Sequence, residues 1–427
     1  MPPSAREIGK EMMNSHSTNL KRVVITGMGC VSPLGRGVST LVQGIEAGRC
    51  AVRAMDDWKH YIGLRSLVGA PAELKDEKLI PRQSRRSMGR LSLFAVQAAQ
   101  DALIDAGIDP DSNLTTGRMG CVVGSTTGSA ISISQAFETM LPDHDLTKLS
   151  SMQFFHCISH TATMNVAQHL KLNGWVMATS AACASAMQAI GAGYDLIRLG
   201  RQDAMLCGGA EELHPTVTGS FDVLFATSVK YNATPTLTPR PFDRDRDGLV
   251  CGEGAGIMLL EDYDHAVKRG ARIHAEVLGY HTCSSGDHVS ESSRPAMVAC
   301  MHEALRQSGL EPRQVDYINA HATATLQGDK EEAEAIREVF GDSVPVSSLK
   351  GYLGHTLGAS AAIELSAALA GMRQDRLYPT LNLENVSPEC QGIHHIQGAP
   401  EQRAARIVVK NSFAFGGISA VLVCRMV

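Results

Sequence analysis

Short apolar segments that end in glycine or small polar residues alternate along the chain with longer segments of helical periodicity. Residues 22–26, 120–124 and 203–211 are short segments with the length and composition of buried strands. A long helical pattern covers residues 91–106 and stops at Gly107, a residue type that often follows the last turn of a helix. Buried strands that alternate with helices predict an α/β fold with mostly parallel sheets.

The order of these segments repeats along the chain. Residues 102–110 and 304–312 share the pattern Ala-Leu-x-x-x-Gly-aliphatic-acidic-Pro, and a predicted strand follows each. Each copy also has a glycine- and alanine-rich helix entrance, one at Cys183 and one at residues 354–362. We therefore expect a duplicated α/β unit with its active site between the halves, at the carboxyl ends of strands. The predicted parts are a polar tail at 1–21, an N-terminal half at 22–271 and a C-terminal half at 272–427.

Composition narrows the class of protein. The 427 residues are enough for one large or two medium domains, and the formal net charge of −5 disfavours general nucleic-acid binding. Eleven cysteines, with no CxxC pair and no Cys/His metal spacing, indicate reduced thiols in the cytoplasm and no metal. No apolar segment has the length of a membrane span, and the first 19 residues lack the apolar core of a signal peptide, so we expect a soluble protein.

Two segments imitate ligand-binding motifs without meeting their requirements. Gly27 and Gly29 follow a predicted strand as in a dinucleotide-binding loop, but Ser32 stands where the third glycine is needed. The acidic run that starts at Asp243 is similar to a calcium loop, but its twelfth position, which should be a bidentate glutamate, is Gly254. We expect neither ligand, and we interpret the acidic run as an ordered turn held by charge pairs.

Cys183 lies at a predicted helix entrance, in the segment Ala178-Thr-Ser-Ala-Ala-Cys183-Ala-Ser-Ala. Unpaired N–H groups and the dipole at a helix N-terminus stabilise a thiolate, which predicts a lowered thiol pKa and a nucleophilic role. The small neighbouring residues would let an acyl substrate approach closely. A buried structural cysteine is the alternative interpretation, and it is the commoner fate of an intracellular cysteine.

Three later segments also end strands or open helices. They are residues 319–325 around His321, residues 347–358 around His355, and residues 410–417. Each histidine alone is more often structural, but glycine- and threonine-rich turns are poor packing sites and good functional ones. A cysteine paired with histidine favours acyl transfer through a thioester, and a second histidine is more than simple thiol activation needs.

Together, the Cys183 segment and residues 240–248, 350–358 and 411–417 resemble the β-ketoacyl-(acyl carrier protein) synthases, elongating condensing enzymes of the thiolase superfamily. The resemblance implies a five-layered αβαβα thiolase fold of two similar halves, normally a tight dimer whose partner is a second copy or a chain-length factor. The implied reaction is decarboxylative Claisen condensation of an acyl group with malonyl-acyl carrier protein, which gives 3-oxoacyl-acyl carrier protein and CO2. No metal or cofactor of its own is implied, because phosphopantetheine arrives on the carrier protein.

The resemblance also implies a role for each matching residue. Cys183 would hold the acyl chain, while His321 and His355, as neutral N–H donors, would promote malonyl decarboxylation and bind the thioester oxygen. Lys350, paired with Glu364, would orient the groups around it rather than transfer protons. The other implied positions are Cys183, Phe415 and Gly416 at the oxyanion hole and gate, and Thr323 and Thr325 on the pantetheine arm.

Departures from the family pattern favour a specialised pathway. The family usually has His-Gly-Thr-Ser-Thr where this chain has His321-Ala-Thr-Ala-Thr325, and a glycine-rich turn where Thr126 and Thr127 stand. Those two threonines would make a turn of the acyl pocket more polar and β-branched. Residues 284–294 also lack the usual Pro-Pro-Glu-Asn run. We therefore expect polyene, aryl polyene or other type II polyketide elongation, with housekeeping fatty acid synthesis as the alternative.

A basic cluster precedes the helical pattern at 91–106. As an ordinary charge run it would be a solvated helix face, but in an otherwise acidic protein it also predicts a docking patch for acyl carrier protein. The cluster consists of Arg82, Arg85, Arg86 and Arg90.

Two other classes of protein share parts of this pattern. A non-catalytic partner like a chain-length factor would have the same fold without the nucleophile, whereas Cys183, both histidines and Lys350 are present here. A thiol hydrolase or a biosynthetic thiolase is the other class. Thiolases use a Cys/His/Cys set, and no second cysteine of this chain occupies a comparable turn.

Overall fold

Two similar sets of strands form the core of the computed structural model, which describes residues 20–289 and 291–427. The predicted tail at 1–21 therefore lies almost entirely outside the described residues. In the first set the strands lie in the order β1–β8–β7–β5–β6, with β8 antiparallel to β1 and β7, and β5 parallel to β7 and β6. The strands of this set are β1 (Val23–Ser32), β5 (Met119–Gly124), β6 (Val176–Thr179), β7 (Ala204–Glu211) and β8 (Gly254–Asp262).

The second set repeats this order as β9–β16–β15–β10–β11, and its neighbours run in the same relative directions. The two sets join where β1 pairs with β9, with Val23 opposite Val277. This repetition confirms the duplicated α/β unit that the sequence predicts. The strands of this set are β9 (Ala275–Ser284), β10 (Tyr317–Asn319), β11 (Pro345–Ser347), β15 (Ile407–Ala414) and β16 (Ile418–Met426).

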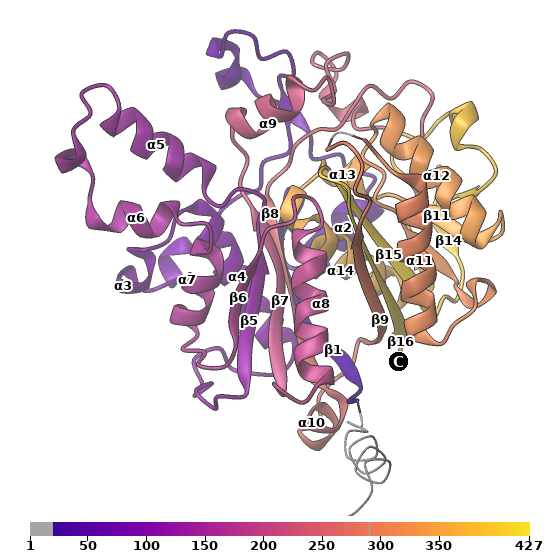
Figure 1. The fold of residues 1–427 in the computed structure, drawn as a ribbon, viewed down its shortest axis with the longest axis horizontal. Helices are drawn as coiled ribbons and strands as arrows, with labels where there is room; N and C mark the ends of the chain where they lie inside the picture. The colour runs from indigo at the N-terminus through magenta and orange to yellow at the C-terminus, as the bar shows by residue number, and fades with distance from the viewer. Residues whose placement is uncertain (1–19, 290) are drawn as a thin grey trace, which may run out of the picture.

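Helices lie outside both sets of strands and also between them (Figure 1). α4 and α7 cover the outer side of the first set, and α11 and α12 cover the outer side of the second. α8 and α14 contact each other and strands of both sets, so they form the middle layer. The layers therefore follow the predicted order αβαβα. These helices are α4 (Arg90–Asp105), α7 (Thr161–His169), α8 (Ser185–Arg198), α11 (Arg294–Ser308), α12 (Leu326–Phe340) and α14 (Ser360–Met372).

Shorter elements connect these layers. The remaining α-helices are α2 (Val38–Glu46), α3 (Arg82–Arg85), α5 (Ala130–Met140), α6 (Ser151–Cys157), α9 (Pro215–Asp222), α10 (Tyr263–Lys268) and α13 (Lys350–Leu353). The remaining strands are β2 (Gly35–Arg36), β3 (Arg53–Ala54), β4 (Val68–Gly69), β12 (Arg376–Leu377), β13 (His394–His395) and β14 (Glu401–Gln402). Single 3-10 turns are η1 (Asp56–His60), η2 (Glu77–Leu79), η3 (Leu146–Lys148), η4 (Pro235–Leu237), η5 (Pro312–Gln314), η6 (Leu357–Ala359) and η7 (Pro388–Cys390).

The glycines that imitate a dinucleotide loop lie inside a strand. β1 continues through Gly27 and Gly29 to Ser32, so the strand is longer than the predicted segment 22–26. A Cβ atom added at Gly27 would lie 2.0 Å from the carbonyl oxygen of Ala102 on α4, and one at Gly29 would be equally close to that of Ala98. These glycines therefore let α4 pack directly on β1, and they form no phosphate-binding loop.

The acidic run at 243–248 is an ordered turn, as expected. The Asp243 carboxylate accepts hydrogen bonds from the Arg240 side chain at 3.2 Å and from the backbone N–H groups of Glu384 and Asn385, each at 2.8 Å. Asp247 accepts the backbone N–H of Val229, also at 2.8 Å. The carboxylate oxygens that would ligate calcium thus hold neighbouring chain segments instead. Among the described residues, no helix is both long and apolar enough to span a membrane.

Candidate active site

Cys183 lies in a tight turn between β6 and the first residue of α8, in the predicted strand–turn–helix arrangement. The preceding Ala182 has φ of 46°, a left-handed conformation that a residue with a side chain rarely adopts. Ser185 holds this turn, since its Oγ accepts the backbone N–H of Ala181 at 2.9 Å and donates to the Ala182 carbonyl at 2.7 Å. The strained backbone presents a thiol that is only 3% exposed.

The expected lowering of the Cys183 pKa is not found. Burial raises the pKa of the thiol to about 12, and the positive charge of Lys350 opposes this effect without cancelling it. Removing a sulfur atom from water disfavours the charged thiolate, and this burial is the largest influence on the pKa of Cys183. Cys183 is therefore a protonated thiol in the free protein.

His321 follows β10, and a buried glutamate fixes its backbone. Both carboxylate oxygens of Glu332, on α12, accept backbone N–H groups, from His321 at 2.8 Å and from Ala322 at 2.6 Å. The side chain of Asn411 on β15 donates to the same carboxylate at 3.0 Å. No sequence motif indicates this role for Glu332. Only the folded backbone reveals that it holds the histidine turn.

His355 follows α13, and both its backbone N–H and its backbone carbonyl form hydrogen bonds. Its N–H donates to the Val250 carbonyl at 2.7 Å, and its carbonyl accepts the N–H of Gly252 at 2.8 Å. The backbone N–H of Leu357 donates to Nδ1 of the imidazole at 3.3 Å. A neutral imidazole that accepts at Nδ1 carries its proton on Nε2. This buried Nε2 has no hydrogen-bond partner among the described residues, so it can donate to a ligand.

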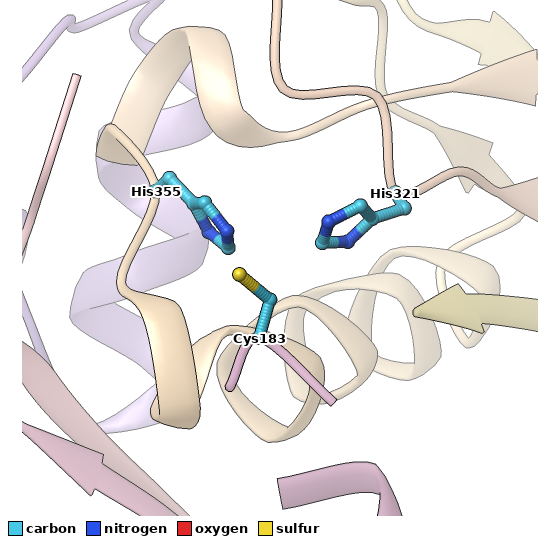
Figure 2. A group of neighbouring side chains, drawn as sticks. All are labelled: Cys183, His321 and His355. Atoms are coloured by element: carbon cyan, nitrogen blue, oxygen red, sulfur yellow. The ribbon is translucent and has the colours of Figure 1, made fainter. Parts of the chain in front are cut away.

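The two imidazole rings lie beside the thiol (Figure 2). The Cys183 sulfur and one nitrogen of each histidine lie within 4.8 Å of one another. The ring centroids of His321 and His355 are 5.2 Å apart with an interplanar angle of 79°. Burial and then the positive charge of Lys350 lower the pKa of both imidazoles well below its ordinary value. Both rings are therefore neutral at physiological pH.

Cys183, His321 and His355 have the ligand types that zinc prefers. A zinc ligand must offer a nitrogen lone pair, whereas the Leu357 N–H directs the His355 proton to Nε2, the nitrogen without a protein partner. The nearby Lys350 charge also repels a cation, as its effect on both imidazole pKa values indicates. The arrangement favours hydrogen-bond donation over metal binding.

A buried charge cluster lies next to the histidines. Lys350 Nζ is 2.7 Å from Glu364 Oε1, which is the ion pair implied by the family resemblance. Lys410 on β15 also contacts this carboxylate, with Nζ 2.6 Å from Oε2, and no sequence motif indicates this role. Burial lowers the pKa of Lys410 to about 8, whereas Glu364 raises it. Two buried lysines thus share one carboxylate.

Two family models match the sequence. The β-ketoacyl synthase N-terminal domain matches residues 20–266, and the β-ketoacyl synthase C-terminal domain matches residues 274–384. The chain belongs to the β-ketoacyl synthase family. It is 33% identical over 407 residues to 3-oxoacyl-[acyl-carrier-protein] synthase 1 of Escherichia coli (strain K12), a match that covers 95% of this chain and 99% of that enzyme.

Solved structures of β-ketoacyl synthases have the same fold. A β-ketoacyl synthase from Burkholderia phymatum STM815 is 42% identical with a TM-score of 0.92, covering 96% of this chain and 100% of that one. The ishigamide ketosynthase/chain length factor is 31% identical with a TM-score of 0.88 and the same coverage. The predicted family, the thiolase-type α/β fold and the acyltransferase class are thereby confirmed.

The pocket of this β-ketoacyl synthase has about 620 Å³ of empty space, including its open mouth, and Cys183 and both histidines line it. Thr323 and Thr325 also line it, with their hydroxyl oxygens 3.1 Å apart. Phe415 lies in the turn between β15 and β16, and its ring contacts that of Phe221 at a centroid distance of 5.8 Å. The backbone N–H of the next residue, Gly416, donates to the Val289 carbonyl at 2.8 Å. The pantetheine, oxyanion and gate roles of these residues stay predictions.

The two predicted acyl-pocket threonines lie apart from this pocket lining. The Thr126 hydroxyl donates to the buried Glu211 at 2.6 Å, and Thr127 is exposed. Their acyl-pocket role stays a prediction.

The basic cluster divides into two parts. Arg82 and Arg86 are exposed on and after α3, and Arg85 is half-buried with Nε donating to the Ile80 carbonyl at 3.0 Å. Arg90 instead forms an ion pair of 2.6 Å with the buried Glu253. The Arg90 side chain is still 31% exposed, so its docking role, like that of the other three arginines, stays a prediction.

Proposed function

We propose that this enzyme condenses an acyl group held on Cys183 with malonyl-acyl carrier protein, giving 3-oxoacyl-acyl carrier protein and CO2. The observation that carries the proposal is one thiol and two neutral imidazoles within 4.8 Å in a buried pocket. We propose acyl carrier protein as the substrate carrier because the name of the Escherichia coli relative includes it. The enzyme needs no cofactor of its own in this proposal, because each substrate arrives on a carrier-bound phosphopantetheine.

In the first half-reaction, the Cys183 sulfur attacks the thioester of the acyl carrier protein. The new bond joins Cys183 to the acyl carbon, and the bond to the carrier sulfur breaks. The thiol proton leaves Cys183 during this attack and ends on the departing carrier thiol. Backbone N–H groups of Cys183 and Phe415 would hold the oxygen of the tetrahedral intermediate, as fixed donors do in other acyl-transfer enzymes.

In the second half-reaction, the malonyl group loses CO2 and becomes an enolate. Its thioester oxygen gains negative charge at that moment, so N–H donors from His321 and His355 would lower the barrier. The enolate carbon then attacks the acyl carbon, the Cys183–acyl bond breaks, and the thiolate takes up a proton. Neutral imidazoles suit this step, because a cationic imidazole would protonate the enolate. Their low pKa values support the assignment.

We infer a specialised pathway, with polyene, aryl polyene or other type II polyketide elongation first and housekeeping fatty acid synthesis second. The polar turn at Thr126 and Thr127 and the absence of the Pro-Pro-Glu-Asn run support this order. A non-catalytic role like that of a chain-length factor is disfavoured, because Cys183 and both histidines line one pocket. We place the enzyme in the cytoplasm, in keeping with its eleven free cysteines.

Mass spectrometry of the carrier protein tests the reaction. The purified enzyme is incubated with an acyl-acyl carrier protein and malonyl-acyl carrier protein, and the products are followed with the CO2 released. A 3-oxoacyl product formed with one equivalent of CO2 supports the proposal. Free acid without chain extension would indicate a hydrolase, and no turnover with any acyl chain would favour a non-catalytic subunit.

Two arginines of the basic cluster, the half-buried Arg85 and the exposed Arg86, give a prediction for carrier docking. Replacing both Arg85 and Arg86 with glutamate should raise the KM for acyl-acyl carrier protein by roughly tenfold, because two attractive charges become repulsive. Alkylation of Cys183 by iodoacetamide should be nearly unchanged. The double variant R313E/R403E, at two other exposed arginines, is the charge-matched control and should keep the wild-type KM. Equal loss of carrier activity and alkylation would contradict a docking role.

An unpaired edge strand supplies the surface for a partner subunit. β6 ends the order of strands, and its neighbouring side chains Trp175 and Val176 are each 46% exposed. An exposed apolar edge is a template for pairing with another strand, so a second copy or a chain-length-factor-like subunit would continue the sheet. The ishigamide ketosynthase/chain length factor supports such an assembly.

Light scattering on the purified chain tests this edge. We expect a dimer, and we expect Val176→Lys to give mainly monomer, because a charge at a buried strand edge disfavours pairing. Val267→Lys is the control, since Val267 is similarly exposed on α10, away from the edge. A dimer that survives V176K would exclude β6 as the interface.

A further inference from the structure

Glu211 is a fully buried carboxylate at the last position of β7. Among the described residues, no lysine or arginine forms an ion pair with it. Its two oxygens instead accept four hydrogen bonds: from Ser125 Oγ at 3.3 Å, from the Thr126 N–H at 2.9 Å, from Thr126 Oγ1 at 2.6 Å, and from the Gly358 N–H at 3.0 Å. The carboxylate therefore joins a turn of the N-terminal half to a turn of the C-terminal half.

The Gly358 side of this junction supports His355. Leu357, between the two residues, has φ of 47°, a strained value for a leucine, and its N–H donates to His355 Nδ1 at 3.3 Å. Glu211 fixes the peptide that follows this strained residue. A Cβ atom added at Gly358 would lie 2.8 Å from Glu211 Oε2, so the turn is seated directly on the carboxylate. One hydrogen bond thus separates Glu211 from the turn that sets the His355 tautomer.

The other side of the junction supports the Cys183 turn. Ser185 Oγ, whose proton goes to the Ala182 carbonyl at 2.7 Å, lies 3.3 Å from the Ser125 carbonyl, and Ser185 holds the strained backbone before Cys183. The Thr126 carbonyl accepts from Ser180 Oγ at 3.3 Å. Glu211 therefore contacts residues next to the Cys183 turn and next to His355, but it is part of neither segment.

The next residue, Glu212, is a second buried glutamate at the carboxyl end of β7, and it holds different segments of the chain. Glu212 is also fully buried, and it accepts the Leu91 N–H at 3.0 Å, Ser129 Oγ at 2.9 Å and the Ile131 N–H at 2.7 Å. These groups lie at the starts of α4 and α5. Glu212 thus joins two helix starts and contacts neither catalytic turn, which makes it a matched structural control.

We propose that Glu211 is a positioning residue for condensation, which holds the His355 turn and the Cys183 turn in their mutual arrangement. It touches no reacting atom in this role. Its carboxylate fixes the relative position of the nucleophile from one half and the N–H donor from the other. The inference rests on the proposed condensing function and adds a residue to it.

The variant Glu211→Gln tests this role with almost no change of shape. The amide oxygen would take the place of Oε2, which alone accepts the Thr126 N–H, the Thr126 hydroxyl and the Gly358 N–H, and without the negative charge it holds these donors more weakly. We expect kcat for condensation to fall roughly 10- to 100-fold, since a shift of about 1 Å in a reacting group can cost that much. The KM for the carrier protein should be unchanged, because docking lies elsewhere. Steady-state kinetics and single-turnover mass spectrometry of acyl-Cys183 measure both quantities.

Glu212→Gln is the control, and thermal unfolding is recorded for both variants. A lower kcat for E211Q at constant KM, with E212Q near wild type, supports the proposal. Equal losses of kcat and thermal stability in E211Q and E212Q would make Glu211 merely structural and overturn it. Unchanged condensation in E211Q would also overturn it.

If E211Q does not fold, Gly358→Ala provides the second variant. Its added methyl group would press on the Glu211 carboxylate, while the backbone N–H is kept. A drop in kcat at constant KM again supports the proposal, and wild-type kinetics overturn it. Failure of the proposed function itself is distinguishable, because the wild-type enzyme would then form no 3-oxoacyl product in the same assay.

Discussion

Replacing Cys183 with alanine should lower the rate of condensation by at least about a thousandfold, because removal of an enzymatic nucleophile commonly costs this much or more. Without the sulfur, no covalent bond can hold the acyl chain while malonyl-acyl carrier protein enters the same pocket. The two histidines remain in C183A, so slow release of CO2 from the malonyl group should persist. Mass spectrometry should find no acyl group on the variant protein.

Cys121→Ala is the matched control for this experiment. Cys121 is fully buried, and burial raises the pKa of its thiol to about 12, as at Cys183. It lies in the middle of β5, away from the pocket lining. C121A should therefore keep condensation within a few-fold of wild type, apart from a modest loss of stability. Full condensation by C183A would end the proposed mechanism.

The fold could be predicted because its signals are local. The strands of each half are recognisable as short apolar segments in the sequence. The repeated pattern at 102–110 and 304–312 indicates the duplication without any long-range information. Cys183 and the two histidines could also be predicted, since each sits in a turn of unusual composition. The structure adds that these turns meet in one pocket.

The parts of the site that could not be predicted depend on packing between distant segments. Lys410 follows Glu364 by 46 residues, and only the packing of α14 against β15 brings their side chains together. Glu211 accepts N–H groups from two turns that no sequence spacing relates. Backbone hydrogen bonds of this kind carry no sequence signal, because any residue except proline can donate them.

One prediction was wrong because burial decided the outcome. The pKa of Cys183 was expected to fall at a helix start, but the surrounding core raises it. A helix entrance can be recognised in the sequence, whereas the depth at which it is buried in the folded protein cannot.

Replacing Glu364 with leucine should lower the free energy of unfolding by roughly 3–5 kcal/mol, the usual cost of leaving a buried charge without its partner. Lys350 and Lys410 both contact this carboxylate, and all three side chains are at most 1% exposed. Leucine would leave two ammonium groups facing each other in the core. Denaturant unfolding followed by circular dichroism measures the loss. Glu334→Leu is the control, because it breaks an exposed ion pair with Arg294 and should cost at most about 1 kcal/mol.

The pH dependence of this loss gives a sharper test. Burial already lowers the pKa of Lys410 to about 8 in the wild type, below its ordinary value of 10.5. Between those two values the unfolded chain binds more protons than the folded one, so this lysine destabilises the protein most below pH 8 and less as the pH rises. Loss of Glu364 removes the charge that favours the Lys410 ammonium group and so lowers the pKa of Lys410 further. The deficit of E364L relative to wild type should therefore be largest near neutral pH and shrink toward pH 10, and a deficit independent of pH would contradict the charge cluster.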